Sequence, residues 1–398
     1  MSGGVYVVGV AAHPWARWPD KGSLEMAEDV YTRALADAGI PSADVGAVVS
    51  ASSRFEGGMG WGLHANELIQ QVGESGATAI NVGGGCAAGG IAIGTAVALI
   101  ASGQYDVVVA VGAEKMPPGF IPRPPGASDS LSDTDFLRWI AIGASNPAYW
   151  ALEARRRMFE YGTSEATFAE SVSLMRRNGV HNPLARFRTE PTPAEVLLSK
   201  VVTDPLHLLE VCAVSDGAAA VVLVSAEYAQ RRDLPLIEVA GAAMTTGTFG
   251  DRSVRIPTIS QNARPNGHST SEVRGAVDRA LTMARVDRSD VDILEFADNS
   301  AWHILAWPEQ LGYLEPGAAD AMVASGILGN GRTVFNPGGG FHSFGEATTA
   351  QGVLQVCELV WQLRGTAGPI QVEGARVAQT AVLGLGSNGA SIVLRSLD

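Results

Sequence analysis

An internal repeat constrains this chain more than any other feature of its sequence. Arg279 lies 246 positions after Arg33, and Asp290 lies 246 positions after Asp44, with similar residues around both members of each pair. In each copy the apolar periodicity predicts an amphipathic helix, a short polar turn and an apolar strand. Helix-turn-strand units are common and can resemble one another by chance, but the gapless spacing across both elements favours duplication.

Each half continues in the same order beyond the repeat. A glycine turn precedes a long predicted helix, and an apolar strand ends the half; the helices cover 86–103 and 346–365, and the strands cover 106–112 and 378–385. Alternating strands and helices indicate an α/β fold whose parallel sheets are covered on both faces. We place the N-terminal half at residues 1–235 and the C-terminal half at 236–398.

Residues 117–205 interrupt this pattern. The segment is rich in proline, arginine and aromatic residues, and helices are predicted near 146–161 and 164–179. We expect an inserted loop domain that lies over the first half and carries substrate contacts, as insertions of this length commonly do. Arginine clusters at 155–157 and 176–177 can meet an anionic ligand, or they can form solvated helix faces.

Cys86 follows the apolar run 78–82, which predicts a buried strand, and three glycines that permit a sharp turn. A cysteine that opens a helix is near unpaired N–H groups and the positive end of the helix dipole, which lower a thiol pKa and can hold an oxyanion. This setting suits a nucleophile. The competing interpretation is a small apolar residue at a strand-helix packing point.

Composition excludes several functional classes. A net charge of −13 argues against nucleic acid as the main partner. Three widely spaced cysteines and the lack of an apolar leader predict a reducing, cytoplasmic setting without disulfides. The uncharged stretch 83–103 consists mainly of glycine and alanine and follows a strand, so we expect a helix inside a soluble core rather than a membrane span. No metal-ligand spacing occurs.

Five motifs together resemble the thiolase superfamily, in particular the branch of sterol-carrier-protein-x thiolases and lipid-transfer-protein-like aldolases. They are residues 81–90, 111–116, 212–220, 336–340 and 361–365. The resemblance covers nearly the whole chain. It implies a five-layered α/β/α/β/α fold from two duplicated halves with an inserted loop domain, a homodimer, and coenzyme A thioesters as substrates. It also implies coenzyme A as substrate or product carrier with no permanently bound cofactor, and suggests a small zinc-ribbon/OB-fold partner protein.

The same resemblance implies a site in which Cys86 accepts the acyl group. The activating histidine of the branch is replaced by Glu346, in Gly345-Glu346-Ala347, and residues 297–300 read Ala-Asp-Asn-Ser, which offers Asp298. A second cysteine near the C-terminus is absent. His342 or His303 can supply an imidazole, or each can be a structural histidine.

Glycines near the C-terminus have two possible roles. Gly384, Gly386 and Gly389 formally fit a dinucleotide fingerprint, but no βαβ unit or acidic ribose ligand follows them, so we reject nicotinamide binding. In the family this loop lies beside the nucleophile. Gly386 and Gly384 are therefore expected to supply backbone groups for an oxyanion hole.

These residues predict a thiolase-like acyltransferase that acts on a carbon-carbon bond of an acyl-CoA thioester, with Cys86 as acyl acceptor and Glu346 as base. Gly345-Glu346-Ala347 also resembles the side-chain-cleaving aldolases, so the first alternative is retro-aldol cleavage of a β-hydroxyacyl-CoA. The aldolases have tyrosines near the motifs where this chain has Thr348 and Ala297. The second alternative is a non-catalytic subunit that binds acyl-CoA or serves as a scaffold.

Overall fold

The two halves of the chain build their strands in the same spatial order. The computed structural model describes residues 4–52, 63–73, 75–116, 146–246, 272–384 and 388–397. The first half has the order β3-β2-β4-β7-β1, formed by Thr78–Val82, Ala47–Ala51, Val107–Lys115, Asp216–Ser225 and Val5–Ala12. The second has the order β10-β9-β11-β12-β8, formed by Val334–Phe335, Ile293–Phe296, Val377–Gly384, Asn388–Ser396 and Ile237–Thr246. If the five strands of each half are numbered in chain order, both halves have the spatial order 3-2-4-5-1.

The ten strands form one continuous sheet because β1 and β8 pair through Tyr6 with Glu238 and Val7 with Ile237. The predicted parallel pairing is confirmed for three strands of each half, and the remaining strands pair antiparallel. Strands β2, β3 and β4 are parallel, as are β9, β10 and β11, whereas β7 and β12 run antiparallel to their neighbours. A strand that follows its neighbour after only a few residues, as β12 follows β11, pairs antiparallel.

The predicted helix-turn-strand repeat is present in both halves. In the first half, α1 (Ser23–Ala38) leads through the 3-10 turn Ser42–Asp44 to β2. In the second, α10 (Glu272–Ala284) leads through Arg288–Asp290 to β9. Helices α1 and α2 (Ala65–Val72) cover the outer face of the first half, and α10 covers the outer face of the second.

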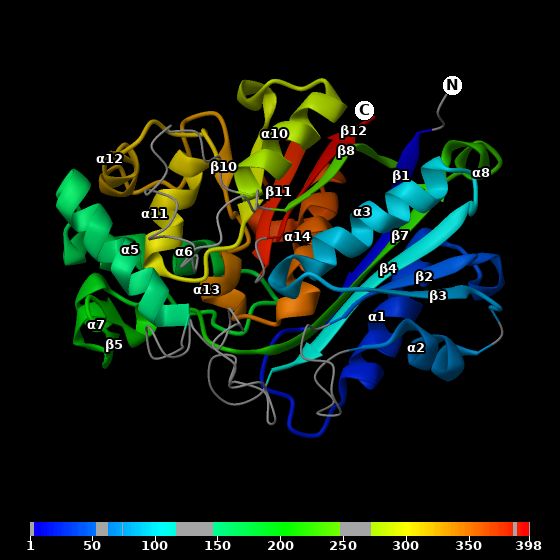
Figure 1. The fold of residues 1–398 in the computed structure, drawn as a ribbon, viewed down its shortest axis with the longest axis horizontal. Coiled ribbons are helices and arrows are strands. Elements are labelled where there is room, and N and C mark those ends of the chain that lie inside the picture. The colour runs from blue at the N-terminus through cyan, green and yellow to red at the C-terminus, as the bar shows by residue number, and fades with distance from the viewer. Residues whose placement is uncertain are drawn as a thin grey trace, which may run out of the picture.

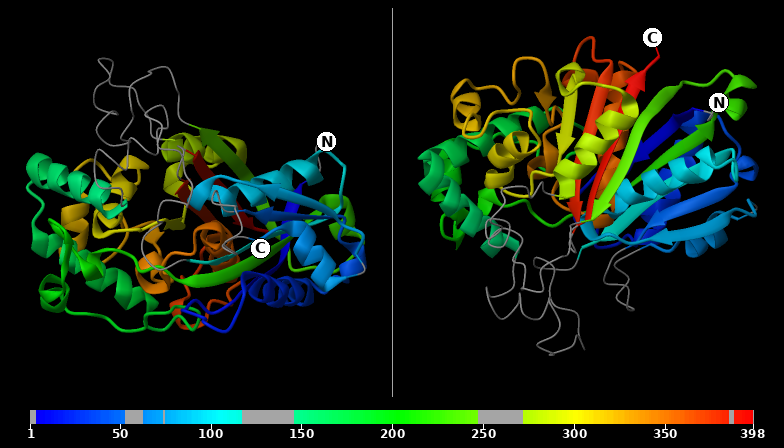
Figure 2. Two further views of the ribbon diagram at one scale, coloured as in Figure 1. Left: turned by 60° about the horizontal axis from the view of Figure 1, so that its bottom comes forward. Right: turned by 45° about the horizontal axis from the view of Figure 1, so that its top comes forward.

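Two helices fill the space between the halves, so the predicted five-layered α/β/α/β/α architecture is confirmed. They are α3 (Ala88–Ala101) and α14 (Thr348–Leu363), and each contacts strands of both halves. Figure 1 shows them between the cyan and green strands and the red strands, and Figure 2 shows the same layering from two further directions.

Glycines let α3 and α14 approach each other closely. A Cβ on Gly89 would come within 2.8 Å of the Val353 nitrogen, and one on Gly352 within 2.6 Å of the Gly90 nitrogen. The small residues after Cys86 therefore serve close packing within the core, as predicted. Of the helices in the described part of the chain, none has both the length and the apolarity needed to span a bilayer.

Strand β3 lies at the edge of the sheet, and on one side it has no neighbouring strand among the described residues. Thr78, Ala79 and Asn81 are exposed. The prediction of a buried strand is therefore wrong for the single chain, because nothing in the described residues covers this edge.

The described part of the insertion packs against the second half, so the expectation that it covers the first half is wrong. It contains α5 (Asn146–Tyr161), α6 (Glu165–Gly179), α7 (Pro193–Leu198) and the hairpin β5-β6 (Val201–Thr203, Leu206–His207). These helices lie beside α11 (Ala301–Gln310), α12 (Ala319–Ala324) and α13 (Gly340–Phe344) (Figure 1).

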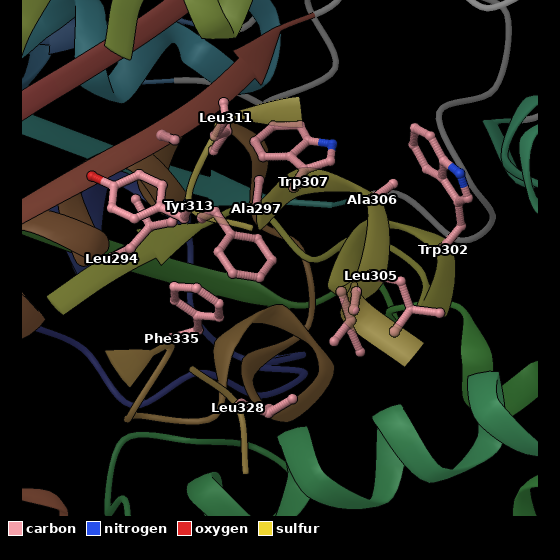
Figure 3. Close-up of a cluster of buried hydrophobic side chains, with 14 of the residues drawn as sticks. Leu294, Ala297, Trp302, Leu305, Ala306, Trp307, Leu311, Tyr313, Leu328 and Phe335 are labelled. Carbon is pink, nitrogen blue, oxygen red and sulfur yellow. The ribbon is translucent and has the colours of Figure 1, made fainter. Parts of the chain in front are cut away.

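Apolar and ionic contacts both hold the insertion there. Phe168 and Val172 of α6 belong to the same buried core as Trp302, Leu305 and Trp307 of α11, and the α11 part of this core is shown in Figure 3. The buried guanidinium of α5, Arg157, binds Glu309 at 2.8 and 2.9 Å and Asp320 at 2.7 Å. The short remaining elements are α8 (Ala226–Gln230) and the 3-10 turns Gly85–Ala87, Leu208–Glu210 and Gly368–Ile370.

Candidate active site

Cys86 lies in a tight turn between β3 and α3. The 3-10 turn Gly85–Ala87 leads directly into α3, and Gly85 has φ of 59°, a conformation that favours glycine. Gly384, at the end of β11, packs on this turn so closely that a Cβ there would come within 2.8 Å of the Ala87 nitrogen. The Cys86 side chain is 7% exposed. The second half of the chain thus packs over this turn, and the Cys86 thiol is buried at the start of α3.

Glu346 lies just before α14, and its backbone is fixed by neighbouring chain. Its N–H donates to the Ala213 carbonyl at 2.7 Å, and its carbonyl accepts from the Ser215 N–H at 2.8 Å. The Cys86 sulfur donates to Oε1 of Glu346 at 3.2 Å. Two side chains that are 260 positions apart in the sequence therefore meet in one site, as predicted.

Burial controls the proton affinity of this pair. It raises the pKa of Glu346 to about 7, because desolvation outweighs the hydrogen bond from Cys86, and the charge of Glu114 adds to the rise. Burial, followed by the charges of Glu346 and Glu114, also raises the pKa of the Cys86 thiol well above its ordinary value. The lowering of the thiol pKa that was expected at a helix start is therefore outweighed by burial and by these charges. The resting thiol keeps its proton, and the carboxylate is the group that can accept it.

Glu114, at the end of β4, was not predicted as a site residue. Its carboxylate accepts from the Thr349 N–H at 2.6 Å and from the Thr348 hydroxyl, at the first turn of α14. The side chain is 2% exposed. It therefore both caps the helix that follows Glu346 and places a second negative charge near the site.

Asp298 and His342 form a separate pair. Asp298 accepts from the Asn336 side chain at 3.1 Å and from the N–H groups of Phe341 and His342 at 2.7 and 3.1 Å. It also binds the His342 ring at Nδ1, at 2.9 Å. Asp298 thus anchors the start of α13, and no hydrogen bond joins this pair to Cys86 among the described residues. The Nε2 atom of His342 is buried without a hydrogen-bond partner there.

His303 has the surroundings of a structural histidine. Its Nδ1 shares a hydrogen bond with the Ser300 hydroxyl at 2.8 Å, and its ring packs edge-on against Trp150 and Trp302. Burial, assisted by His342, lowers its pKa to about 3, which keeps the ring neutral at physiological pH.

Two family models match the chain over most of its length. One, described as "Thiolase, N-terminal domain", matches residues 5–132, and the other, "Thiolase C-terminal domain-like", matches residues 253–396. The chain belongs to the thiolase family. The predicted resemblance is thereby confirmed, and the family assignment makes this thiolase an acyltransferase by class.

The thiolase is similar to several known proteins over nearly its whole length. It is 32% identical to the acetyl-CoA acetyltransferase of Methanothermobacter thermautotrophicus, over 98% of this chain and 98% of that protein. It is 31% identical to sterol carrier protein 2 of Gallus gallus, over 98% of this chain and 71% of that protein. A solved structure described as "Ltp2-ChsH2(DUF35) aldolase" matches with a TM-score of 0.80 at 24% identity, covering 100% of this chain and 98% of that one. At that identity the likeness shows the fold.

A second thiol of this thiolase, Cys212, also reaches Glu346. Its sulfur lies 4.0 Å from Oε2 of Glu346, and the Asn299 amide lies 3.8 Å from that sulfur. Sequence reasoning missed both residues as site residues. The motif 212–220 contained the cysteine, but nothing local in the sequence indicates contact with a residue 134 positions away.

The expected oxyanion loop is only partly described. Gly384 lies against the Cys86 turn, as its Cβ position shows. Gly386 lies outside the described residues. No group of three or more histidine, cysteine or acidic residues is arranged to hold a metal ion in the described ranges.

Proposed function

We propose that this thiolase-family acyltransferase uses Cys86 to accept the acyl group released from a carbon-carbon bond of an acyl-CoA thioester. Coenzyme A serves as substrate or product carrier. The observation that supports these roles is the 3.2 Å contact between the Cys86 sulfur and Glu346 Oε1. A buried carboxylate with pKa of about 7 is half ionised near neutral pH, which suits a general base.

In this mechanism the Cys86 sulfur attacks the keto carbon of a 3-ketoacyl-CoA. The S–H bond breaks, the proton passes to Glu346 Oε1, and a C–S bond forms. The carbon-carbon bond then breaks, leaving the acyl group on Cys86 and an acyl-CoA carbanion that takes up a proton from an acid at the carbon. The thiol of coenzyme A then gives its proton to the conjugate base of that acid and attacks the acyl group. The C–S bond to Cys86 breaks, the second acyl-CoA leaves, and Glu346 returns its proton to the Cys86 sulfur. Backbone groups near Gly384 and Gly386 are the proposed oxyanion contacts.

We assign the second proton transfer, at carbon, to the Asp298–His342 pair. Asp298 binds Nδ1 of His342 and so fixes the ring orientation, while Nε2 is the buried atom without a partner in the described residues. Asp298 acts through the histidine, so it is a positioning residue in this scheme.

Mass spectrometry of the intact protein tests the role of Cys86. After mixing with a 3-ketoacyl-CoA, the wild type should gain the mass of one acyl group, and Cys86→Ala should not. Peptide mapping should place the adduct on Cys86. An equal adduct in the Cys86→Ala variant would remove Cys86 from the reaction.

Retro-aldol cleavage is a second candidate, favoured by the high pKa of the Cys86 thiol. In that reaction Glu346 takes the proton of a β-hydroxyl group and Cys86 forms no covalent bond. Release of an aldehyde or ketone from a β-hydroxyacyl-CoA by the Cys86→Ala variant would support it. A non-catalytic subunit that binds acyl-CoA would react with neither substrate.

We propose a cytoplasmic homodimer built from chains with halves at residues 1–235 and 236–398. The exposed edge of β3, directly before the Cys86 turn, supports an interface at this strand. The described cysteines are all free and buried, which suits a reducing compartment. The similar aldolase structure, whose name includes a DUF35 component, supports testing a small zinc-ribbon/OB-fold partner. Mass measurement of the purified protein, alone and with such a partner, tests both assemblies.

A further inference from the structure

The two oxygens of the Glu346 carboxylate face two different thiols. Oε1 accepts from Cys86 at 3.2 Å, and Oε2 accepts from Cys212 at the longer distance of 4.0 Å. The Asn299 amide donates to the Cys212 sulfur at 3.8 Å. The two hydrogen bonds therefore form a chain, in which the Asn299 amide donates to the Cys212 sulfur and the Cys212 thiol donates to the Glu346 carboxylate.

Backbone contacts on both sides hold Cys212 in this place. Its N–H donates to the Asn299 carbonyl at 3.0 Å, and the preceding residue, Val211, forms an antiparallel bridge with Ser300. On the other side, Val214 forms a parallel bridge with Glu346. The segment that carries Cys212 is thus fixed to both the Asp298-Asn299 turn and the Glu346 loop. The placement of the thiol beside the carboxylate follows from backbone structure, which distinguishes it from an incidental side-chain contact.

We propose that Cys212 is a positioning residue of the active site, whose thiol holds Oε2 of Glu346 so that Oε1 faces Cys86. The inference rests on the proposed role of Glu346 as the base for Cys86. Asn299 orients the Cys212 sulfur. The alternative, a cysteine that only fills space, leaves the alignment of the buried Asn299 amide on the sulfur unexplained, since that side chain is 9% exposed and its donor is directed at a weak acceptor.

The thiol of Cys212 stays protonated throughout the reaction in this proposal. When Cys86 forms its C–S bond, the proton from Cys86 moves to Oε1, and the Cys212 S–H bond to Oε2 remains intact, so no further reactant is needed. A hydrogen bond donated to a carboxylate favours its ionised form. Loss of the hydrogen bond from Cys212 should therefore raise the pKa of Glu346, so that the carboxylate is ionised and can act as a base only at higher pH.

Alkylation of Cys86 by iodoacetamide tests this without any acyl-CoA. The rate is measured against pH in the full chain, with peptide mapping to count only the Cys86 adduct. In the wild type the rate should rise with pH as Glu346 ionises. Cys212→Ala should move that rise to higher pH by about one unit, a roughly tenfold lower rate on the acid side. Cys212→Ser keeps a donor and should restore at least half of the shift.

Cys357→Ala is the matched control. Cys357 is also fully buried, but its sulfur contacts the carbonyls of Ala11 and Ala220, away from the site. It should lose stability and leave the pH profile unchanged. Asn299→Ala should shift the profile in the same direction as Cys212→Ala by a smaller amount, which keeps the test available if Cys212→Ala folds poorly.

An unshifted profile in Cys212→Ala, or in Asn299→Ala where the former does not fold, would overturn the proposal. So would a Ser variant that behaves like Ala. Failure of the proposed function is a separate result, because it would appear as a missing acyl adduct in a wild-type protein whose Cys86 alkylation still depends on Cys212.

Discussion

Cys86 and Glu346 come from opposite halves of a duplicated chain, and the sulfur of one lies 3.2 Å from the carboxylate of the other. Each precedes one of the two helices that fill the middle of the molecule, α3 and α14. The close glycine contacts of those helices therefore determine how near the two side chains can approach. The geometry of the active site in this thiolase thus depends on how α3 and α14 pack in the core.

Removal of the Glu114 charge should shift the pH dependence of Cys86 acylation. Glu114 raises the pKa of Glu346, which is about 7, so the acylation rate in the wild type should rise as pH increases through about 7. In Glu114→Gln the pKa of Glu346 falls, and the rise should occur at lower pH. A profile that stays in place, or moves to higher pH, would contradict the assigned influence of Glu114. The measurement is the rate of adduct formation over pH 5 to about 9, a range that brackets the ionisation.

The stability of the protein should fall as pH rises through the range in which buried carboxylates must ionise. Burial raises the pKa of Glu358 to about 7, above its ordinary value of 4.5, so folding favours the protonated form. This contribution is fully present below about pH 4.5 and is lost as pH rises toward and past 7. Glu358→Gln should therefore unfold at higher urea than the wild type at pH 8, with the advantage shrinking toward pH 5. An advantage that is the same at both pH values would argue against this ionisation.

The buried ion group between the insertion and the second half should be sensitive to loss of its cation. Arg157→Ala leaves Glu309 and Asp320 without the guanidinium, and should lower the free energy of unfolding by about 3 to 5 kcal/mol. The neighbouring Arg156 pairs with Glu160 on the exposed side of the same helix, where Arg156→Ala should cost less than about 1 kcal/mol. Urea denaturation of both variants measures the difference. Similar losses in the two would mean that the Arg157 group does not hold the insertion.

Two helix glycines should respond in opposite ways to alanine. A Cβ at Gly352 of α14 would lie 2.6 Å from the Gly90 nitrogen, so Gly352→Ala should destabilise by about 1 to 3 kcal/mol. At Gly275 of α10 the nearest atom is an ordinary 3.7 Å away, so Gly275→Ala should stabilise by about 0.5 to 1 kcal/mol. Thermal melts distinguish them, and a stabilised Gly352→Ala would show that the two central helices can separate freely.

Local patterns in the sequence were sufficient for much of the fold. The helix of the insertion at Glu165–Gly179 begins where Ser164 caps it, with the Ser164 hydroxyl accepting from the Thr167 N–H. The pairing of Cys86 with Glu346 was expected from the resemblance to the thiolase superfamily, because Glu346 occupies the motif position of the histidine that activates the cysteine, and the glycine turns before both helices agree with it. Local signals of this kind locate elements and place residues at their ends.

Long-range packing was not predictable from the same signals. The amphipathic pattern of α6 indicates a buried face, but it does not identify α11 as the neighbour that covers it. The helix start predicted a lowered thiol pKa, whereas burial and the Glu346 charge raise it, and neither depth nor neighbouring charge can be inferred from residues 83–90. The position of Cys212 likewise depends on backbone bridges to two distant loops.

Replacement of the carboxylate is the most direct test of Glu346 as the base for Cys86. The measurement is the rate at which an acyl adduct forms on Cys86 in a single turnover, for the wild type, Glu346→Gln and the exposed control Glu227→Gln. Loss of a general base should slow Glu346→Gln by about 10²- to 10⁴-fold and abolish the rise of the rate through pH 7, with Glu227→Gln unchanged. A Glu346→Gln variant that acylates Cys86 at the wild-type rate, with the same pH dependence, would contradict the proposed chemistry.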